Sequence, residues 1–317
     1  MGYLFKRYKE EIIACSIFIF FALGFNVYRV QSDGADYYAV LEGILHLPGS
    51  GSVHISVFHQ AGCVFFNLPF YLLAYLAESF LKANLHLNGI TLRQISINLA
   101  SNFYMLMSIV ITIRMLKRLN FKSILLPIIS ILFSTSAFCV SVLMPSFTHA
   151  VDIFVNTLII YFVLDSSRNH RSAFWLGIIY TVAILIRYAN FVLVFPLLFY
   201  YFLSGEWKKI KFFAAGLISF GWIIPVVFYF FNGSAFSAYD IKNAGAVQAV
   251  AGLPHWPRFI LNSLFSPVHG LFIWSPVTIV SALGLAVMPK AIKKIGYLFL
   301  GIWLFIVIFY GYMFFWS

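Results

Sequence analysis

Charged side chains are scarce in this sequence. Asp, Glu, Lys and Arg together make up 10% of it, whereas a soluble globular domain carries about 25%. Acidic residues are scarcest, with ten Asp and Glu in 317 residues. Hydrophobic residues account for 62% of the chain and aromatic residues for 20%. This composition excludes an ordinary soluble domain.

Cysteine is also rare. Cys15, Cys63 and Cys139 lie in or beside apolar runs and form no C-x-x-C pair, so neither a disulfide framework nor a cysteine zinc site is indicated. The net charge is +11, which in a soluble protein would favour nucleic-acid binding. In an apolar chain, basic residues act mainly as anchors in cytoplasmic loops. No nucleic-acid partner is therefore expected.

Long apolar runs are what the chain has in abundance. Several reach the roughly 20 residues that a helix needs to cross a bilayer. They predict an all-α polytopic membrane protein with about nine transmembrane helices, and the first run reads as an uncleaved signal anchor. The expected spans are 12–30, 95–113, 123–142, 147–165, 173–186, 189–204, 212–231, 274–289 and 295–315.

The positions of the basic residues predict whether one further apolar run, 61–81, crosses the membrane. Five clusters hold 15 of the 21 Lys and Arg residues: FKRYKEE, RMLKRLNFK, DSSRNHR, EWKKIK and KAIKK. If 61–81 does not cross the membrane, all five fall on the cytoplasmic side, as the positive-inside rule prefers. Pro69 also suits a bent element. We therefore expect 61–81 to be an in-plane or re-entrant helix.

The stretch 173–204 is too long for one span, and RYAN (Arg187 to Asn190) interrupts it. Two short helices that meet at this polar break keep EWKKIK on the cytoplasmic side. A single long helix would place it outside. The charge rule therefore predicts two helices.

This threading gives one domain, 1–317, with a cytoplasmic N-terminus and two large outer loops, 31–94 and 232–273. Seven of the eight histidines and most acidic residues then fall on the outer side or at its membrane edge. They are His46, His54, His59, His86, His149, His255, His269, Asp33, Asp36, Glu42, Glu78, Asp152 and Asp240. A transporter more often places such groups at the membrane midplane. The distribution favours an outward-facing active site.

The first outer loop begins with SDGADYY (Ser32 to Tyr38), which holds two of the ten acidic residues. Residues 34–46 carry apolar positions at helical spacing and predict an amphipathic helix that can lie on the bilayer surface. Asp33 and Asp36 could simply cap that helix. One of them could instead be a general base, positioned by the same helix terminus. The two readings are compatible.

These residues resemble the GT-C superfamily of membrane glycosyltransferases, which includes the protein mannosyltransferases and aminoarabinose transferases. The closest likeness is to bacterial family-39-like proteins, in which S-D-G-x-x-Y-Y is followed by a G…P-F segment. The chain has Ser32-Asp33-Gly34, Tyr37-Tyr38 and Gly62…Pro69-Phe70. The resemblance implies a GT-C-like fold in the bacterial inner membrane, with Asp33 as the catalytic acid-base residue and Asp36 second. It also implies an in-plane or re-entrant helix at 61–81.

Three later segments extend the resemblance: PSFTHAVDIF (145–154), ILIRYANFVLVFPLL (184–198) and SPVHGLFIWSPV (266–277). Proteins of that family usually continue beyond the position at which this chain reads YGYMFFWS. A short variant, a truncated chain or an interrupted reading frame would each explain the difference.

Several further residues are candidates for substrate or phosphate binding: Tyr37, His149, Arg187, Arg258 and His269. Arg187 lies at a membrane break, where a charge usually faces a cavity or a partner, although it could also snorkel to the interface. His149 and Asp152 share a helix face. They could orient each other or help to hold a divalent metal, but most metal sites need three or more ligands.

The leading hypothesis is an inverting glycosyltransferase. It would move a sugar from a polyprenyl-phosphate donor to a glycan, lipid or protein acceptor on the outer face, with no cofactor except a divalent metal if one stabilises the leaving phosphate. The alternatives are a transporter or flippase for a lipid-linked substrate and a non-catalytic relative. A flippase needs polar residues along a path through both leaflets, and here they gather mostly on one side.

Overall fold

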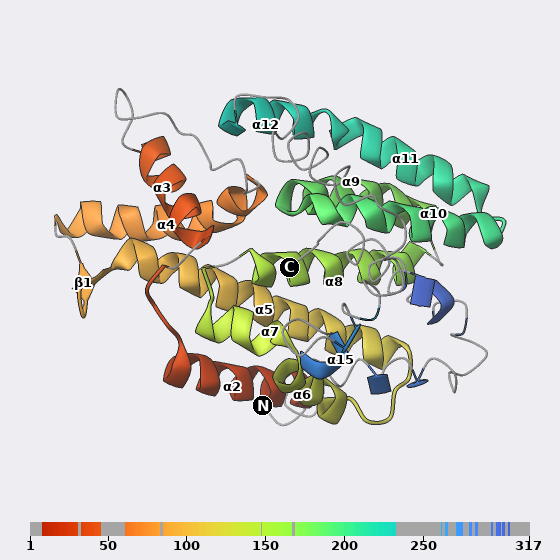
Figure 1. The fold of residues 1–317 in the computed structure, drawn as a ribbon, viewed down its shortest axis with the longest axis horizontal. Helices are drawn as coiled ribbons and strands as arrows, with labels where there is room; N and C mark the ends of the chain where they lie inside the picture. The colour runs from red at the N-terminus through yellow and green to blue at the C-terminus, as the bar shows by residue number, and fades with distance from the viewer. Residues whose placement is uncertain are drawn as a thin grey trace.

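The computed structural model describes residues 8–30, 33–45, 61–82, 85–146, 148–166 and 169–232, together with short pieces between 261 and 304. This part of the chain is almost entirely helical (Figure 1). The elements are α2 (Lys9–Phe25), α3 (Asp33–Leu45), α4 (Gly62–Leu81), β1 (His86–Leu87), β2 (Ile90–Thr91), α5 (Leu92–Arg118), α6 (Leu125–Ser134), α7 (Ser136–Phe138), the π-helix η1 (Cys139–Leu143), α8 (His149–Ser166), α9 (His170–Ile186), the 3-10 helix η2 (Tyr188–Leu193), α10 (Val194–Leu203), α11 (Trp207–Gly221), α12 (Ile223–Asn232) and α15 (Leu271–Trp274).

The predicted all-α class is confirmed for these residues, and each predicted span from 12–30 to 212–231 is largely helical. The spans 274–289 and 295–315 lie mostly outside the described residues. Among the described residues, three stretches are long and apolar enough to cross a membrane: Gly62–Leu81, Leu92–Arg118 and Trp207–Phe231. Many large apolar side chains on them are exposed, among them Phe80 and Ile218, as expected of helices that face lipid.

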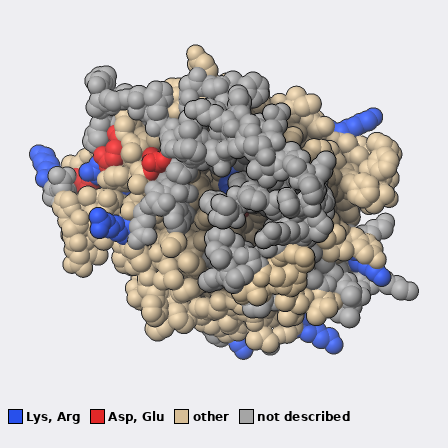
Figure 2. Space-filling view, viewed as in Figure 1, with Lys and Arg blue, Asp and Glu red and all other residues tan. Residues whose placement is uncertain are grey.

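One end of the bundle collects basic side chains. Lys117 at the end of α5 forms ion pairs with Glu10 and Glu11 at the start of α2, at 2.9 and 2.8 Å. Arg118 pairs with Asp165 at the end of α8, and His170 at the start of α9 stacks on Phe212 of α11. Four of the five basic clusters therefore have described residues at this end, which we call the basic end. Basic side chains project from it in Figure 2, on the right.

Helices α3 and α4 and the β1–β2 hairpin lie at the opposite end (Figure 1, left). The visible acidic side chains gather over them in Figure 2. The hairpin pairs His86 with Thr91, and its turn places Asn88 and Gly89 at positive φ. The predicted amphipathic helix is present as α3, which buries Tyr37, Val40 and Leu41 and lies steeply across the direction of the long helices (Figure 1).

Helix α4 runs antiparallel to the first half of α5, because Glu78 contacts Arg93 whereas Phe66 packs on Tyr104. Its start meets the end of α9, since Gly62 lies against Leu185 and Ile186. Neither end of α4 reaches the basic end (Figure 1), and that 61–81 does not cross the membrane stays a prediction, because the helix is long and apolar enough to span one. The expected bend is absent, because Pro69 lies inside one uninterrupted helix. A membrane helix tolerates the single missing N–H donor, and the helix lies alongside α5 instead of flat across it.

The predicted break at RYAN is confirmed. Helix α9 ends at Ile186, Arg187 is extended (φ −150°, ψ 125°), and η2 leads into α10. Two glycines bring the backbones of α9 and α11 into close contact. A Cβ on Gly177 would lie 2.2 Å from the carbonyl oxygen of Phe213, and one on Gly216 would lie 2.1 Å from that of Phe174. Small residues of this kind are typical of helix contacts in membranes.

Candidate functional site

The start of α8 and the end of α9 bring three predicted residues together: His149, Asp152 and Arg187. Nη1 of Arg187 lies 3.1 Å from Nδ1 of His149 and 3.7 Å from Oδ2 of Asp152. A guanidinium can only donate, so Nδ1 of His149 accepts this bond. The imidazole is then neutral and carries its proton on Nε2. Arg187 keeps a third of its side chain exposed, so a ligand can reach the guanidinium.

Asn190 holds this group in place, a role that its sequence context did not predict. Its Nδ2 donates to Oδ1 of Asp152 at 2.7 Å and to the carbonyl oxygen of Ala183 at 2.9 Å. Asn156 adds a hydrogen bond from Nδ2 to Oδ1 of Asp152 at 3.0 Å. The polar letters of RYAN were the available signal. These polar residues predicted a break between two helices. They did not predict that Asn190 and Arg187 both contact Asp152, a residue on another helix.

The start of α3 lies against the loop that precedes α8. A Cβ on Gly34 would lie 2.3 Å from the Cβ of Ser146, so only glycine allows this approach without a shift. Gly34 belongs to SDGADYY and Ser146 to PSFTHAVDIF. Gly34 is therefore in contact with this loop at Ser146, three residues before His149. Two of the motifs behind the family resemblance meet here.

The two aspartates of the first loop occupy the first turn of α3. The helix includes Asp33 as its first residue, and an offset of one residue from a capping position is within the usual uncertainty of helix ends. Asp36 is half-buried. Tyr37 is 1% exposed and belongs to the apolar core, so a ligand does not reach its ring in this conformation. Its binding role remains a prediction.

Helix α4 adds a second contact between distant motifs. Gly62 begins the predicted G…P-F segment, and its Cα lies against the backbone of Leu185 and Ile186, directly before Arg187. The described residues of the segments at 33–38, 62–70, 145–154 and 184–190 thus lie together at the end of the bundle opposite the basic end. They are far apart in sequence, and local patterns alone do not dictate their proximity.

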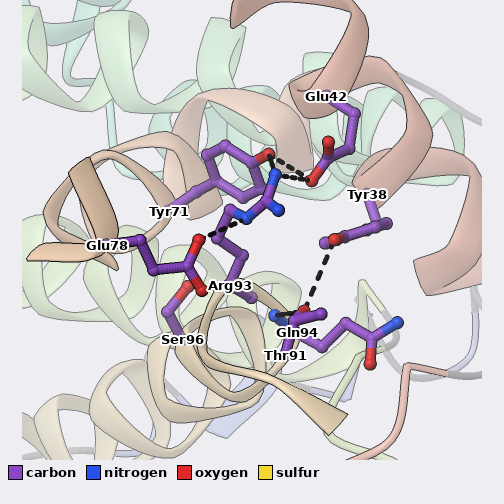
Figure 3. A network of polar contacts seen from close by, with 8 residues as sticks. All are labelled: Tyr38, Glu42, Tyr71, Glu78, Thr91, Arg93, Gln94 and Ser96. Carbon is purple, nitrogen blue, oxygen red and sulfur yellow. Dashed lines mark hydrogen bonds and ion pairs between the residues drawn. The ribbon is translucent and has the colours of Figure 1, made fainter. Parts of the chain in front are cut away.

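A second polar cluster lies between α3, α4 and α5 (Figure 3). Its centre is Arg93, in the first turn of α5, a residue to which no sequence motif pointed. Nη1 of Arg93 donates to Oε1 of Glu42 at 2.6 Å, and Tyr71 donates to the same oxygen at 2.5 Å. Nε of Arg93 lies 2.8 Å from Oε2 of Glu78, an ion-pair distance without the alignment of a hydrogen bond. We call these four residues the Arg93 network.

A further contact joins α3 to the hairpin. The hydroxyls of Tyr38 and Thr91 lie 3.5 Å apart, and Thr91 also caps α5 by accepting from the backbone N–H of Gln94 at 3.2 Å. Burial raises the pKa of Tyr38 above its ordinary value, and the neighbouring Glu42 adds to the rise. The phenol is therefore neutral and acts as a hydrogen-bonding group.

Two predicted binding residues, Arg258 and His269, lie outside the described residues. Within the described residues, no group of three or more His, Cys, Asp or Glu side chains could hold a metal ion. His149 and Asp152 are accordingly a pair whose described neighbours are Arg187, Asn156 and Asn190. The guanidinium occupies the position beside both of them where a cation would otherwise sit.

Comparison with known proteins adds no assignment. No family model matches the chain, and no curated protein and no solved structure matches it.

Proposed function

We propose that the chain is a membrane glycosyltransferase that uses a polyprenyl-phosphate sugar as donor and works at the end of the bundle that carries α3. One observation supports this above the others. Gly34 of the SDG segment contacts Ser146. His149, which lies three residues after Ser146, contacts Arg187. The first turn of α3, with its carboxylates, thus belongs to the same end of the fold as an accessible guanidinium and a neutral imidazole.

The roles follow from the charges that the reaction develops. Asp33 takes the proton of an acceptor hydroxyl, and the oxygen attacks the anomeric carbon of the sugar from the side opposite the phosphate. The bond between that carbon and the phosphate oxygen breaks, with inversion, and polyprenyl phosphate leaves with an added negative charge. Arg187 stabilises that charge, and Nε2–H of His149 provides a second donor. The apolar helix surfaces accommodate the isoprenoid chain.

Purified protein in detergent tests the proposal. Wild type, Asp33→Asn and Asp36→Asn are compared for transfer from radiolabelled polyprenyl-phosphate sugars to envelope acceptors. We expect Asp33→Asn to lower kcat at least ~100-fold, the scale of a lost general base, while the protein keeps its detergent-stable fold. A selective loss in Asp36→Asn would move the base three residues along. The absence of transfer by the wild type from any donor would contradict the proposal. A flippase would show no activity in this assay, because it needs a membrane that separates two compartments.

A further inference from the structure

The Arg93 network lies outside the proposed catalytic group, yet it concentrates charge that is costly to bury. The side chain of Arg93 is 15% exposed and that of Glu78 is 7% exposed. Ion pairs that are this well buried add little net stability compared with apolar packing, but breaking one partner is strongly destabilising. Their attested use is to fix one arrangement of neighbouring elements. We therefore ask which helices the Arg93 network holds in a fixed arrangement.

The contacts of the network divide by helix. Glu42 comes from α3, Tyr71 and Glu78 come from α4, and Arg93 comes from α5. Nη1 of Arg93 and the hydroxyl of Tyr71 both bind Oε1 of Glu42, so α4 and α5 hold the same atom of α3. In Figure 3 the guanidinium lies between Glu42 and Tyr71 on one side and Glu78 on the other. Tyr38, one turn earlier on α3, adds its contact with Thr91.

Helix α3 carries the proposed base at its other end. Glu42 lies nine residues after Asp33, about 14 Å along a helix that rises 1.5 Å per residue. A rigid helix transmits a fixed position over that length, so an anchor at Glu42 sets the direction in which the first turn points. The first turn is also supported by the contact between Gly34 and Ser146.

We propose that Arg93 and Glu42 form a latch that fixes α3 against α4 and α5 and thereby positions Asp33 for catalysis. Glu42 and Arg93 are positioning residues in this scheme, since neither touches substrate. The part that concerns Asp33 rests on the proposed function, whereas the latch itself concerns only the three helices. Glu78 pairs with Arg93 from α4, so this ion pair joins α4 to α5 and does not involve α3.

This division supplies a matched pair of variants. Glu42→Gln and Glu78→Gln each remove one carboxylate charge beside the same guanidinium and preserve side-chain shape. Only Glu42→Gln weakens the contacts that hold α3. The glutamine amide would give Arg93 and Tyr71 a neutral oxygen to bind in place of the carboxylate oxygen of Glu42. Both variants leave Arg93 with one ionised partner, so neither creates the unpaired buried guanidinium that could prevent folding.

Two readouts are taken on the full chain in nanodiscs. The first is the distance distribution between spin labels at Ala39→Cys on α3 and Leu99→Cys on α5, both exposed positions, with the three native cysteines replaced by alanine. The second is kcat and donor KM. We expect Glu42→Gln to broaden the distribution and to lower kcat ~10-fold or more, because misplacing a reacting group by about 1 Å is costly. Donor KM should not change, and Glu78→Gln should keep the wild-type distribution and kcat.

The outcomes separate the latch from the proposed function. A broadened distribution in Glu42→Gln alone, together with its loss of kcat, supports the full proposal. An unchanged distribution in Glu42→Gln, or equal broadening in both variants, overturns it. If wild type transfers no sugar, the proposed function fails, and the distance measurement alone decides whether the latch exists. A broadened distribution with normal kcat would show a latch that does not position the base, and this part of the proposal would be withdrawn.

Discussion

At the scale of single residues, the polar group around Asp152 explains how a charge is held at the break between α9 and α10. An unpaired guanidinium near membrane depth is expensive. Arg187 lies 3.7 Å from Asp152 and 3.1 Å from His149, so its charge is balanced while part of it stays accessible. Asn190 completes the arrangement, because one amide donates to both the carboxylate and the carbonyl oxygen of Ala183 in the last turn of α9.

Removal of this amide should therefore be costly. We expect Asn190→Ala to lower the free energy of unfolding by about 1–3 kcal/mol, the scale of leaving buried hydrogen-bonding groups without partners. Asn156→Ala is the comparison and should cost less, since it removes contacts within α8 and one long hydrogen bond of 3.4 Å to Oδ1 of Asn190. Unfolding in mixed micelles of increasing denaturing-detergent content measures both. Equal stability of Asn190→Ala and wild type would show that the break does not depend on this side chain.

At the scale of elements, the close approach of α9 and α11 depends on two glycines. Gly216→Ala would place a Cβ 2.1 Å from the carbonyl oxygen of Phe174, and backbone cannot move aside as a flexible side chain can. We expect a loss of about 1–3 kcal/mol, the usual cost of overpacking. Gly221→Ala on the same helix meets nothing within 4 Å and should be neutral or slightly stabilising, because alanine favours helix over glycine. Thermal unfolding in detergent distinguishes the two variants, and equal effects would contradict the packing argument.

The elements also show which features local patterns can predict. The break at RYAN and the amphipathic α3 depend on residues adjacent in sequence, and both were predicted. The Arg93 network depends on partners 51 and 22 residues away from Arg93. A basic residue at the start of a span is usually interpreted as an interface anchor. The local sequence therefore does not distinguish the buried Arg93 from a solvated arginine. The contacts of Gly34 and Gly62 were missed for the same reason, since a glycine does not reveal what its missing side chain makes room for.

At the scale of the whole molecule, the two ends of the bundle differ in charge and in architecture. Glu10, Glu11, Lys117, Arg118 and Asp165 are joined by ion pairs at the basic end, where short turns connect the helices. The opposite end carries α3, α4, the hairpin and the group around Asp152. Basic residues in short loops mark the cytoplasmic side of a membrane protein. The asymmetry is what we expect if the basic end faces the cytoplasm and the proposed site lies on the outer face.

Cysteine accessibility tests this orientation. His86 in the hairpin and Ser123 in the turn after α5 are both exposed. The hairpin and the turn that joins α5 to α6 lie at opposite ends of the bundle (Figure 1). In a cysteine-free background, we expect a membrane-impermeant maleimide to label His86→Cys in intact cells and Ser123→Cys only after permeabilisation, because the positive-inside rule retains the RMLKRLNFK loop in the cytoplasm. The reverse pattern would place α3 and Arg187 inside. An outward-facing lipid-linked donor would then be out of reach, and the proposed function would fail on topology alone, before any assay of transfer.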